Sequence, residues 1–157
     1  MTILDLIRLF AEPLTTAVVM TDIDLERPGP TILYANPAFA DMSGYTASEV
    51  LGASPRLLQG PETKMQQTRL VARKLRAEGR FHGVLQNYRK SGEPYLCEID
   101  VRPVLDQGGQ LLAYLAFERE VARRRGRPSS DPHGRYRPIT VEADDLGAMG
   151  AAPAVFG

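Results

Sequence analysis

Three side chains that can exchange hydrogen bonds or protons lie within alternating apolar segments of this chain of 157 residues. By the two-residue period of a strand, Asn87 shares a face with Leu85, and Cys97 and Glu118 also share faces with apolar residues. An amide, a thiol and a carboxyl on one face of a sheet need partners once they are buried. They could bind one another or water, or they could satisfy the polar edge of a ligand. The spacing alone does not decide between these alternatives.

A second candidate is the loop GASPRLLQGPET, residues 52–63, which lies between two helix-like segments. Glycines bracket this loop, and Arg56 and Gln59 stand in it among apolar residues. Pro55 directly precedes the arginine. Such a loop either connects two helices or forms the wall of a binding site.

Enzyme signatures are absent from the sequence. It contains no GxSxG, HExxH, Walker or GxGxxG pattern. The two histidines, His82 and His133, lie far apart, and we interpret both as structural or surface residues. The RRRGR run lacks the interleaved aromatic residues and the fold motif of a nucleic-acid site. The sequence therefore predicts neither an enzyme nor a nucleic-acid-binding protein.

Composition narrows the class of protein further. The formal net charge is zero and 43% of residues are apolar, which predicts a globular chain without an anionic membrane or nucleic acid as its partner. Cys97 is the single thiol, so neither an internal disulfide nor a CxxC metal site can form, and a reducing cytoplasm is the expected location. The N-terminus lacks a basic signal region, and no stretch reaches the ~18–20 apolar residues of a membrane span.

Periodicity predicts the elements that position these side chains. Apolar residues at helical spacing over residues 3–10 predict a short amphipathic helix, which packs on its own domain or pairs with a second subunit. Thr46 and Glu49 have the spacing of a capping box. Further helices are expected over residues 36–45, 46–52 and 63–78, and strands over residues 15–24, 32–36, 81–90, 94–104 and 109–121.

These elements predict an α+β fold, a five-stranded antiparallel sheet with short helices on one face. A cavity between the sheet and the helices is the expected ligand pocket. The chain divides into an N-terminal amphipathic helix (1–13), one domain (14–121) and a mostly disordered tail (122–157), which is rich in arginine, proline, glycine and small residues.

Four stretches resemble a PAS domain of the flavin-binding LOV (light-oxygen-voltage) type. They are YANPAFADMSGYTASEVLG, RLLQGPET, NYRKSGEPY and VRPVLDQGGQLLAYLAF, and the resemblance covers residues 16–121. RxLQGPET followed by NYxKxG is specific to this type. GVLQNYRK and YLCE are also similar to the flavin-binding PAS redox sensors of nitrogen-fixation and methane-oxidation regulators. The resemblance implies a PAS fold that holds FMN, with FAD as the alternative.

The resemblance also implies a role for individual residues. Arg56 would pair with the flavin phosphate, because a guanidinium binds phosphate through two hydrogen bonds. Gln59 would face the polar side chain of the cofactor, and Asn87 would bind the pyrimidine edge of the ring. The residues implied to sandwich the ring are Val19, Thr21, Leu57, Leu70 and Leu85.

Five positions depart from the family pattern, among them Ser54, which stands where the family has an asparagine. Pro55 stands where the family has its photoactive cysteine, so the thiol adduct to the flavin cannot form there. Cys97 stands where the family has a second asparagine that bonds the edge of the ring. Its thiol is therefore expected to point at the ring edge, whereas adduct formation requires a thiol above the plane of the ring. Glu118 stands at a glutamine near flavin N5, where an apolar pocket would raise its pKa and let it donate as an amide does. A second phosphate arginine falls on Ala72, next to Arg73, which we expect to reach the phosphate.

The expected function is therefore sensory and not enzymatic. A flavin-binding PAS protein of this kind would sense light or redox state through flavin reduction, without a cysteinyl adduct and with Glu118 as proton donor. It would pass the signal through a homodimer or an unknown downstream signalling protein. The alternative is a ligand-free PAS module for dimerisation or protein docking, and heme at His82 is a further alternative.

Overall fold

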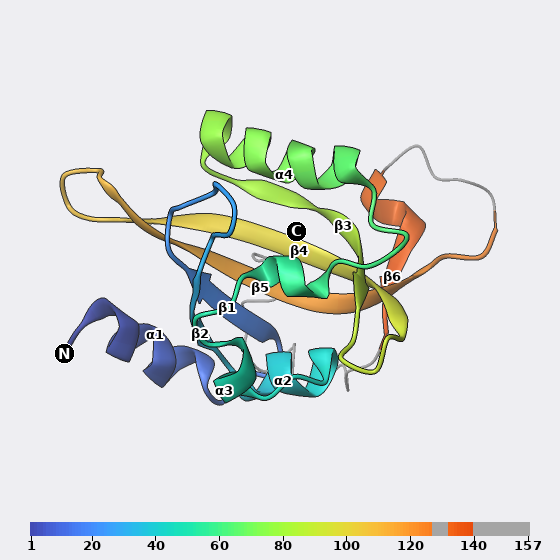
Figure 1. Cartoon of the computed structure of the whole chain (residues 1–157), viewed down its shortest axis with the longest axis horizontal. Coiled ribbons are helices and arrows are strands. Elements are labelled where there is room, and N and C mark those ends of the chain that lie inside the picture. Colours follow the sequence, from blue (N-terminus) through green and yellow to red (C-terminus); the bar gives the residue numbers. More distant parts are fainter. Residues whose placement is uncertain (127–131, 140–157) are drawn as a thin grey trace.

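One antiparallel sheet forms the centre of the molecule, with most of the helices gathered on one of its faces (Figure 1). The computed structural model describes residues 1–126 and 132–139. The strand order is β2-β1-β5-β4-β3, and β6 pairs with β5. The predicted α+β class is confirmed. The strands are β1 (Ala17–Thr21), β2 (Ile32–Ala35), β3 (Phe81–Tyr88), β4 (Pro94–Leu105), β5 (Leu111–Arg123) and β6 (Tyr136–Pro138).

The helices begin and end where the sequence provides caps. Asn36 caps α2 and Pro37 is its first residue, and Gly44 ends it at a φ of 80°. The predicted capping box of α3 is present, with Thr46 and Glu49 each bonding the backbone of the other. The helices are α1 (Ile3–Ala11), α2 (Pro37–Ser43), α3 (Ala47–Val50) and α4 (Met65–Glu78), with 3-10 turns η1 (Pro55–Leu58) and η2 (Pro132–Arg135).

Asn36 joins three elements through one buried amide. Its Oδ1 accepts from the backbone N–H of Val18 at 2.8 Å and of Phe39 at 3.1 Å. Its Nδ2 donates to the carbonyls of Ala11 and Thr16, both at 2.9 Å. The end of α1, strand β1 and the start of α2 are therefore held in one arrangement.

The two faces of the sheet carry different packing. A large apolar cluster lies between the sheet and the layer of α2, α3, η1 and α4. On the opposite face, Leu4 and Ile7 of α1 pack against a smaller cluster around Val18 and Met20. Helix α1 thus packs on its own domain, but Phe10 on its flank is 68% exposed.

The sheet continues beyond residue 121, the predicted end of the domain. The range 122–157 was expected to be a mostly disordered tail, but Ala122 and Arg123 continue β5, and β6 pairs with them. The register joins Val121 to Pro138 and Arg123 to Tyr136, which makes the sheet six-stranded and not five-stranded. Residues 127–131 and 140–157 of the predicted tail lie outside the described residues.

Within the part of the chain that the structure describes, no helix combines the length and apolar character that crossing a membrane requires.

Candidate functional site

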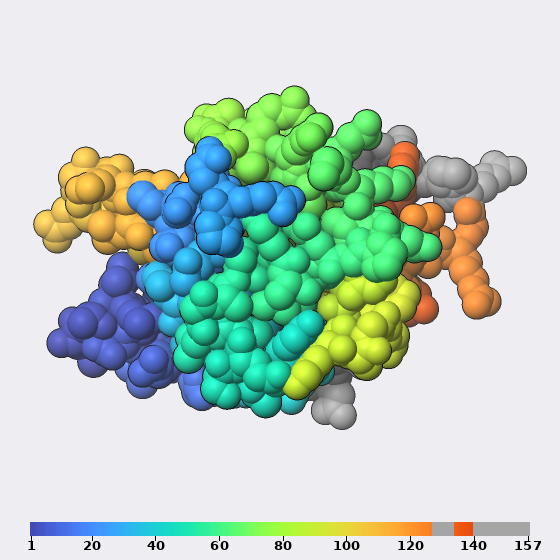
Figure 2. Space-filling model, in the orientation of Figure 1, coloured from blue at the N-terminus to red at the C-terminus, as the bar shows by residue number. Residues whose placement is uncertain are grey.

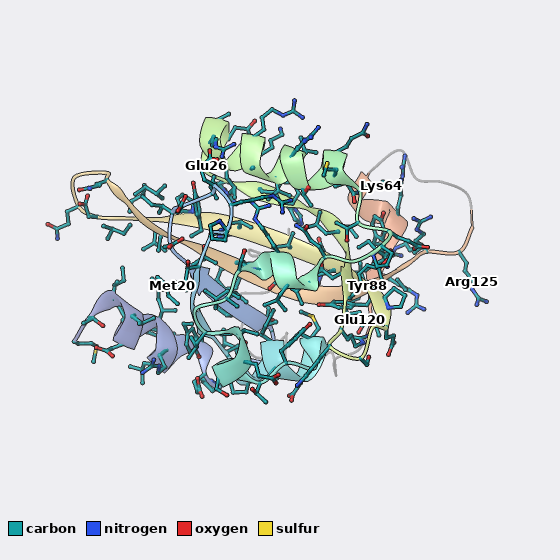
Figure 3. The ribbon with its side chains drawn as sticks, viewed as in Figure 1. Met20, Glu26, Lys64, Tyr88, Glu120 and Arg125 are labelled. Carbon is teal, nitrogen blue, oxygen red and sulfur yellow. The ribbon has the colours of Figure 1, made fainter. Side chains whose placement is uncertain are left out.

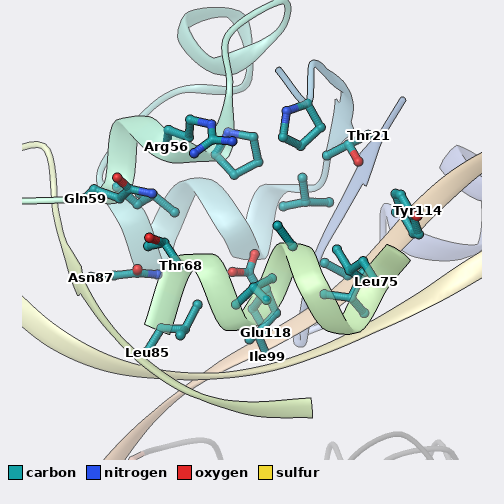
Figure 4. Close-up of a pocket in the computed structure, with 18 of the residues that line it drawn as sticks. Thr21, Arg56, Gln59, Thr68, Leu75, Leu85, Asn87, Ile99, Tyr114 and Glu118 are labelled. Carbon is teal, nitrogen blue, oxygen red and sulfur yellow. The ribbon is translucent and has the colours of Figure 1, made fainter. Parts of the chain in front are cut away.

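A cavity of about 160 Å³ opens between the sheet and the helical layer. This is roughly ten times the space that one buried water needs, so the cavity has room for a molecule larger than a water. The β1–β2 loop (residues 22–31), η1 and α4 meet over it on the side of the molecule seen in Figure 2. Figure 4 shows the side chains that surround it, with Glu118 central.

Most of the predicted site residues line this cavity. Arg56 and Gln59 come from η1 and its end, Asn87 comes from β3, and Glu118 comes from β5 (Figure 4). Val19, Thr21, Pro55 and Leu85 complete the set of predicted residues in the wall. Segments far apart in the sequence are therefore brought to one site.

Four predicted residues lie elsewhere. Leu70 is 38% exposed on α4, and the wall position is taken by its neighbour Val71. Leu57 packs against the apolar core beside the cavity. Arg73 lies with two other arginines in an open groove on the outer side of α4, and Cys97 is fully buried behind the cavity wall.

The prediction also missed several wall residues. Strand alternation places Ile99 and Val101 on one face with Cys97, and Ala116 on one face with Glu118, but none of the three was predicted to line the site. Leu25 and Pro30 line the cavity from the β1–β2 loop, where no periodic signal exists to locate a side chain.

Pro55 has a structural role in the loop. It is the first residue of the 3-10 turn η1, a position that suits proline because its missing N–H has no partner there. The Ser54 hydroxyl caps this turn by accepting from the Arg56 N–H at 3.2 Å. The turn brings Pro55 and Arg56 into the cavity wall.

Arg56 is bound to backbone carbonyls of the β1–β2 loop. Its Nε donates to Gly29 at 2.7 Å and its Nη2 to Leu25 at 3.0 Å. These bonds use two of the five N–H donors of a guanidinium. Burial lowers the pKa of Arg56, and the charges of Arg27 and Arg76 lower it further. Arg56 therefore places one guanidinium in the cavity wall and also holds the β1–β2 loop over the cavity.

The segment that carries Gln59 is fixed by an aromatic side chain. The Tyr88 hydroxyl accepts from the Glu62 N–H at 2.8 Å, and a Cβ on Gly60 would overlap the Tyr88 ring. The Gly60 N–H donates to the Thr63 hydroxyl at 2.8 Å. Tyr88 lies at the same end of the sheet as Glu120 (Figure 3). The wall between η1 and α4 is thus anchored to β3.

Glu118 is a buried carboxyl that no cation among the described residues bonds. It is 5% exposed, and its hydrogen bond within the described residues comes from the Cys97 thiol at 3.6 Å. Burial raises the pKa of Glu118 from 4.5 to about 7, while the bond from Cys97 lowers it. The predicted upward shift of this pKa is confirmed. Near neutral pH the carboxyl can therefore hold or release a proton.

Cys97 remains a thiol. Burial raises its pKa well above the usual range, and the neighbouring Glu118 raises it further. Its sulfur donates to Glu118 and lies 3.7 Å from the Glu98 carbonyl. A protonated thiol behind the wall is a hydrogen-bond donor and not a nucleophile.

A buried hydroxyl without a partner lies on the same sheet face. Tyr95 is the cross-strand neighbour of Asn87, and its hydroxyl has no hydrogen-bond partner within the described residues. Burial raises the pKa of Tyr95, so its hydroxyl stays protonated. The Arg89 guanidinium lies 4.5 Å from the centre of the Tyr95 ring and bonds Glu120 at 2.7 Å.

The histidine considered for heme faces away from this cavity. His82 Nε2 lies 2.7 Å from the Glu98 carboxyl, and Glu98 also accepts from Arg119 at 2.8 Å. His82 alternates with the cavity residue Leu85 along β3. Among the residues that the structure describes, no group of three or more potential metal ligands is gathered.

Comparison with known proteins agrees with this geometry. A PAS domain profile matches residues 15–122. The chain is 33% identical over 116 residues to a blue-light-activated histidine kinase of Brucella anthropi, covering 71% of this chain and 24% of that protein. It is 34% identical over 111 residues to a nitrogen fixation regulatory protein of Klebsiella oxytoca, covering 71% and 21%.

Solved structures of LOV domains share the fold. The LOV domain of the Erythrobacter litoralis EL346 blue-light-activated histidine kinase superposes with a TM-score of 0.60 at 27% identity, covering 67% of this chain and 94% of that one. A LOV domain structure from a flavin-analogue study superposes at 0.63 with 33% identity, covering 68% and 78%.

The antiparallel sheet, its helical layer and the matched profile define the class of this protein as a sensory module. The chain belongs to the PAS domain family. Its relatives and structural neighbours place it with the LOV-type PAS domains, which confirms the family predicted from the sequence. The chain spans about a quarter of the length of the curated relatives named above.

Proposed function

We propose that this chain is a flavin-binding sensory module whose cavity holds an FMN unit, as FMN itself or as part of FAD. The observation that carries the proposal is the cavity between sheet and helices, apolar along its walls, with amide and carboxyl groups inside and the Arg56 guanidinium in its wall. This distribution matches a flat apolar ring with one polar edge and a phosphate-bearing chain.

The residues present fit a flavin. Val19, Leu85 and Ile99 supply apolar walls for the ring. Asn87 is buried in the wall and offers both donors and an acceptor to a polar ring edge. Arg56 keeps N–H donors beyond the two that hold the β1–β2 loop, and these are the groups that would bind phosphate.

The chemistry is that of a flavin without a thiol adduct. A bound flavin supplies absorption of blue light and reversible reduction. Pro55 offers no nucleophile, and the thiol of Cys97 is bonded to Glu118 behind the wall. Glu118 is the group that holds a proton inside the cavity and can deliver it to a basic atom of the ligand.

The signal that the module senses and the surface through which it passes that signal on are the next two parts of the proposal. One relative is named for blue-light activation, which supports light as an input, and the resemblance of GVLQNYRK and YLCE to flavin-binding PAS redox sensors makes redox state the second candidate input. For the output, α1 packs on the outer sheet face and exposes Leu6 and Phe10 on its flank. We infer that the module forms a homodimer through α1 and passes its signal to a separate signalling domain or protein in the cytoplasm.

A ligand-free docking module is the second candidate function. The observation that favours it is the bonding of Arg56 to two loop carbonyls, which closes the mouth with the protein's own backbone. The two functions differ in whether the cavity is a binding site.

Absorption and titration separate these functions. We expect the purified protein to be yellow with a structured blue band, and the apoprotein to bind added FMN. Asn87→Leu should weaken binding about tenfold, because it removes hydrogen bonds worth about 1 kcal/mol each. Gln107→Leu, an exposed amide in the β4–β5 turn, is the matched control and should bind normally.

Illumination then tests the chemistry. We expect the blue band to bleach in the presence of a reductant, without the spectral change of a cysteinyl adduct. A colourless protein that binds neither FMN nor FAD would overturn the proposal in favour of the docking module.

A further inference from the structure

The Cys97 thiol and the Glu118 carboxyl are in contact behind the cavity wall. Cys97 Sγ donates to Glu118 Oε1 at 3.6 Å, from the neighbouring strand β4 to β5. Cys97 is fully buried, whereas the Glu118 carboxyl lines the cavity and points into it (Figure 4). One oxygen of the carboxyl is thus engaged from behind, and the other is left for the cavity.

The direction of this hydrogen bond is set by the surroundings of the sulfur. Cys97 stays protonated because it is buried beside a carboxyl, so its sulfur acts as a donor, with Glu118 Oε1 at 3.6 Å and the Glu98 carbonyl at 3.7 Å as its two acceptors. When Glu118 is neutral, an oxygen that already accepts a proton from sulfur is a poor place for the acid proton. That proton therefore belongs on Oε2, the oxygen that faces the cavity.

No cation in the described residues competes for this carboxyl. Arg89 bonds Glu120 at 2.7 Å, and Arg119 bonds Glu98 on the opposite face of the sheet at 2.8 Å. The strand neighbours of Glu118 are Ala17 on β1 and Ile99 on β4, both apolar. Cys97 is therefore the side chain that orients it.

We propose that Cys97 is a positioning residue that makes Glu118 a hydrogen-bond donor toward the cavity. With Oε1 held by the thiol, the neutral carboxyl presents Oε2–H to the ligand, so the ligand must offer an acceptor atom at this point. This specificity rests on the proposed function for the flavin, but the Cys97–Glu118 pair exists without it.

The FMN affinities of matched Glu118 and Cys97 variants test whether Glu118 donates a hydrogen bond to the ligand. Glu118→Gln keeps an N–H donor and should bind FMN within about twofold of the unchanged protein. Glu118→Leu removes the donor and should bind about tenfold more weakly, as expected for one lost hydrogen bond of about 1 kcal/mol or slightly more. Cys97→Ala should weaken binding several-fold, and Cys97→Ser, which retains a donor, should restore it.

Infrared spectroscopy tests the pair with or without flavin. We expect the S–H stretching band to shift in Glu118→Leu, and the C=O band of the protonated carboxyl to shift in Cys97→Ala. An unshifted C=O band in Cys97→Ala would overturn the positioning role. Equal losses of FMN affinity in Glu118→Gln and Glu118→Leu would overturn the proposal that Glu118 donates a hydrogen bond to the ligand. If the unchanged protein binds no flavin at all, the proposed function is overturned instead. The infrared bands would then still show whether Cys97 positions Glu118.

Discussion

At the scale of single residues, Glu118 has a protonation state that depends on the fold around it. Burial raises its pKa to about 7 in the folded protein, against 4.5 for the free group. Between these two values the folded state keeps a proton that the unfolded chain has released. The free energy of unfolding therefore contains a contribution that is present at low pH and is lost as the pH rises toward 7.

Glu118→Gln should remove this contribution. As the pH rises from about 4.5 to about 7.5, we expect the unchanged protein to lose on the order of 3 kcal/mol more stability than the variant. Urea unfolding of the ligand-free protein across this range measures the difference. Glu62→Gln, an exposed carboxylate in the η1–α4 loop, serves as control. Parallel stability curves for the unchanged protein and Glu118→Gln would contradict the prediction.

Residue types and periods predicted part of this site. The alternation of β5 placed Glu118 on the inner face, and the apolar neighbours predicted its raised pKa. Its partner could not be predicted, because Cys97 lies on another strand and their contact depends on the register of β4 against β5. Leu70 was placed in the wall by the resemblance to the LOV family, whereas the structure puts its neighbour Val71 there and leaves Leu70 38% exposed.

At the scale of elements, the segment between η1 and α4 depends on a close contact with β3. Gly60 lies against the Tyr88 ring, and the Tyr88 hydroxyl accepts from the Glu62 N–H. The sequence showed a glycine in a loop and a tyrosine on a strand, but not that they touch. This contact fixes the segment that presents Gln59 to the cavity.

Gly60→Ala should therefore disturb the wall. The added methyl overlaps the Tyr88 ring, and relieving that overlap should cost about 1–3 kcal/mol of stability. Gly108→Ala, in the β4–β5 turn, adds the same methyl 3.4 Å from the Asp106 carboxylate and is the control. Thermal unfolding and FMN titration report both effects. Equal behaviour of the two variants would show that the loop does not depend on this contact.

At the scale of the whole molecule, the sheet pairs a strand from the start of the domain with a strand from its end. Strand β1 pairs with β5, so Ala17 lies opposite Glu118. The turns of the β3–β4–β5 meander were readable from the sequence, whereas this pairing and strand β6 were not, because each joins segments without a local turn signal. As a result, α1 leads directly into β1, the strand that pairs with β5, which carries Glu118.

This arrangement makes α1 the natural route from the cavity to a second subunit. The helix turns Leu4 and Ile7 toward the sheet, and its flank exposes Leu6 (43%) and Phe10 (68%). A nine-residue helix is too short to be stable without tertiary packing, and adjacent apolar side chains left exposed on it mark an interaction surface.

Replacing Leu6 and Phe10 together by serine should convert the expected dimer to a monomer and leave flavin binding unchanged, because neither side chain lines the cavity. Sedimentation velocity over a range of concentrations measures the association. Leu112→Ser is the control: this leucine is 44% exposed, and by strand alternation it shares the sheet face of Tyr114 and Glu118, opposite α1. An unchanged protein that sediments as a monomer, or a double variant that still sediments as a dimer, would exclude α1 as the interface.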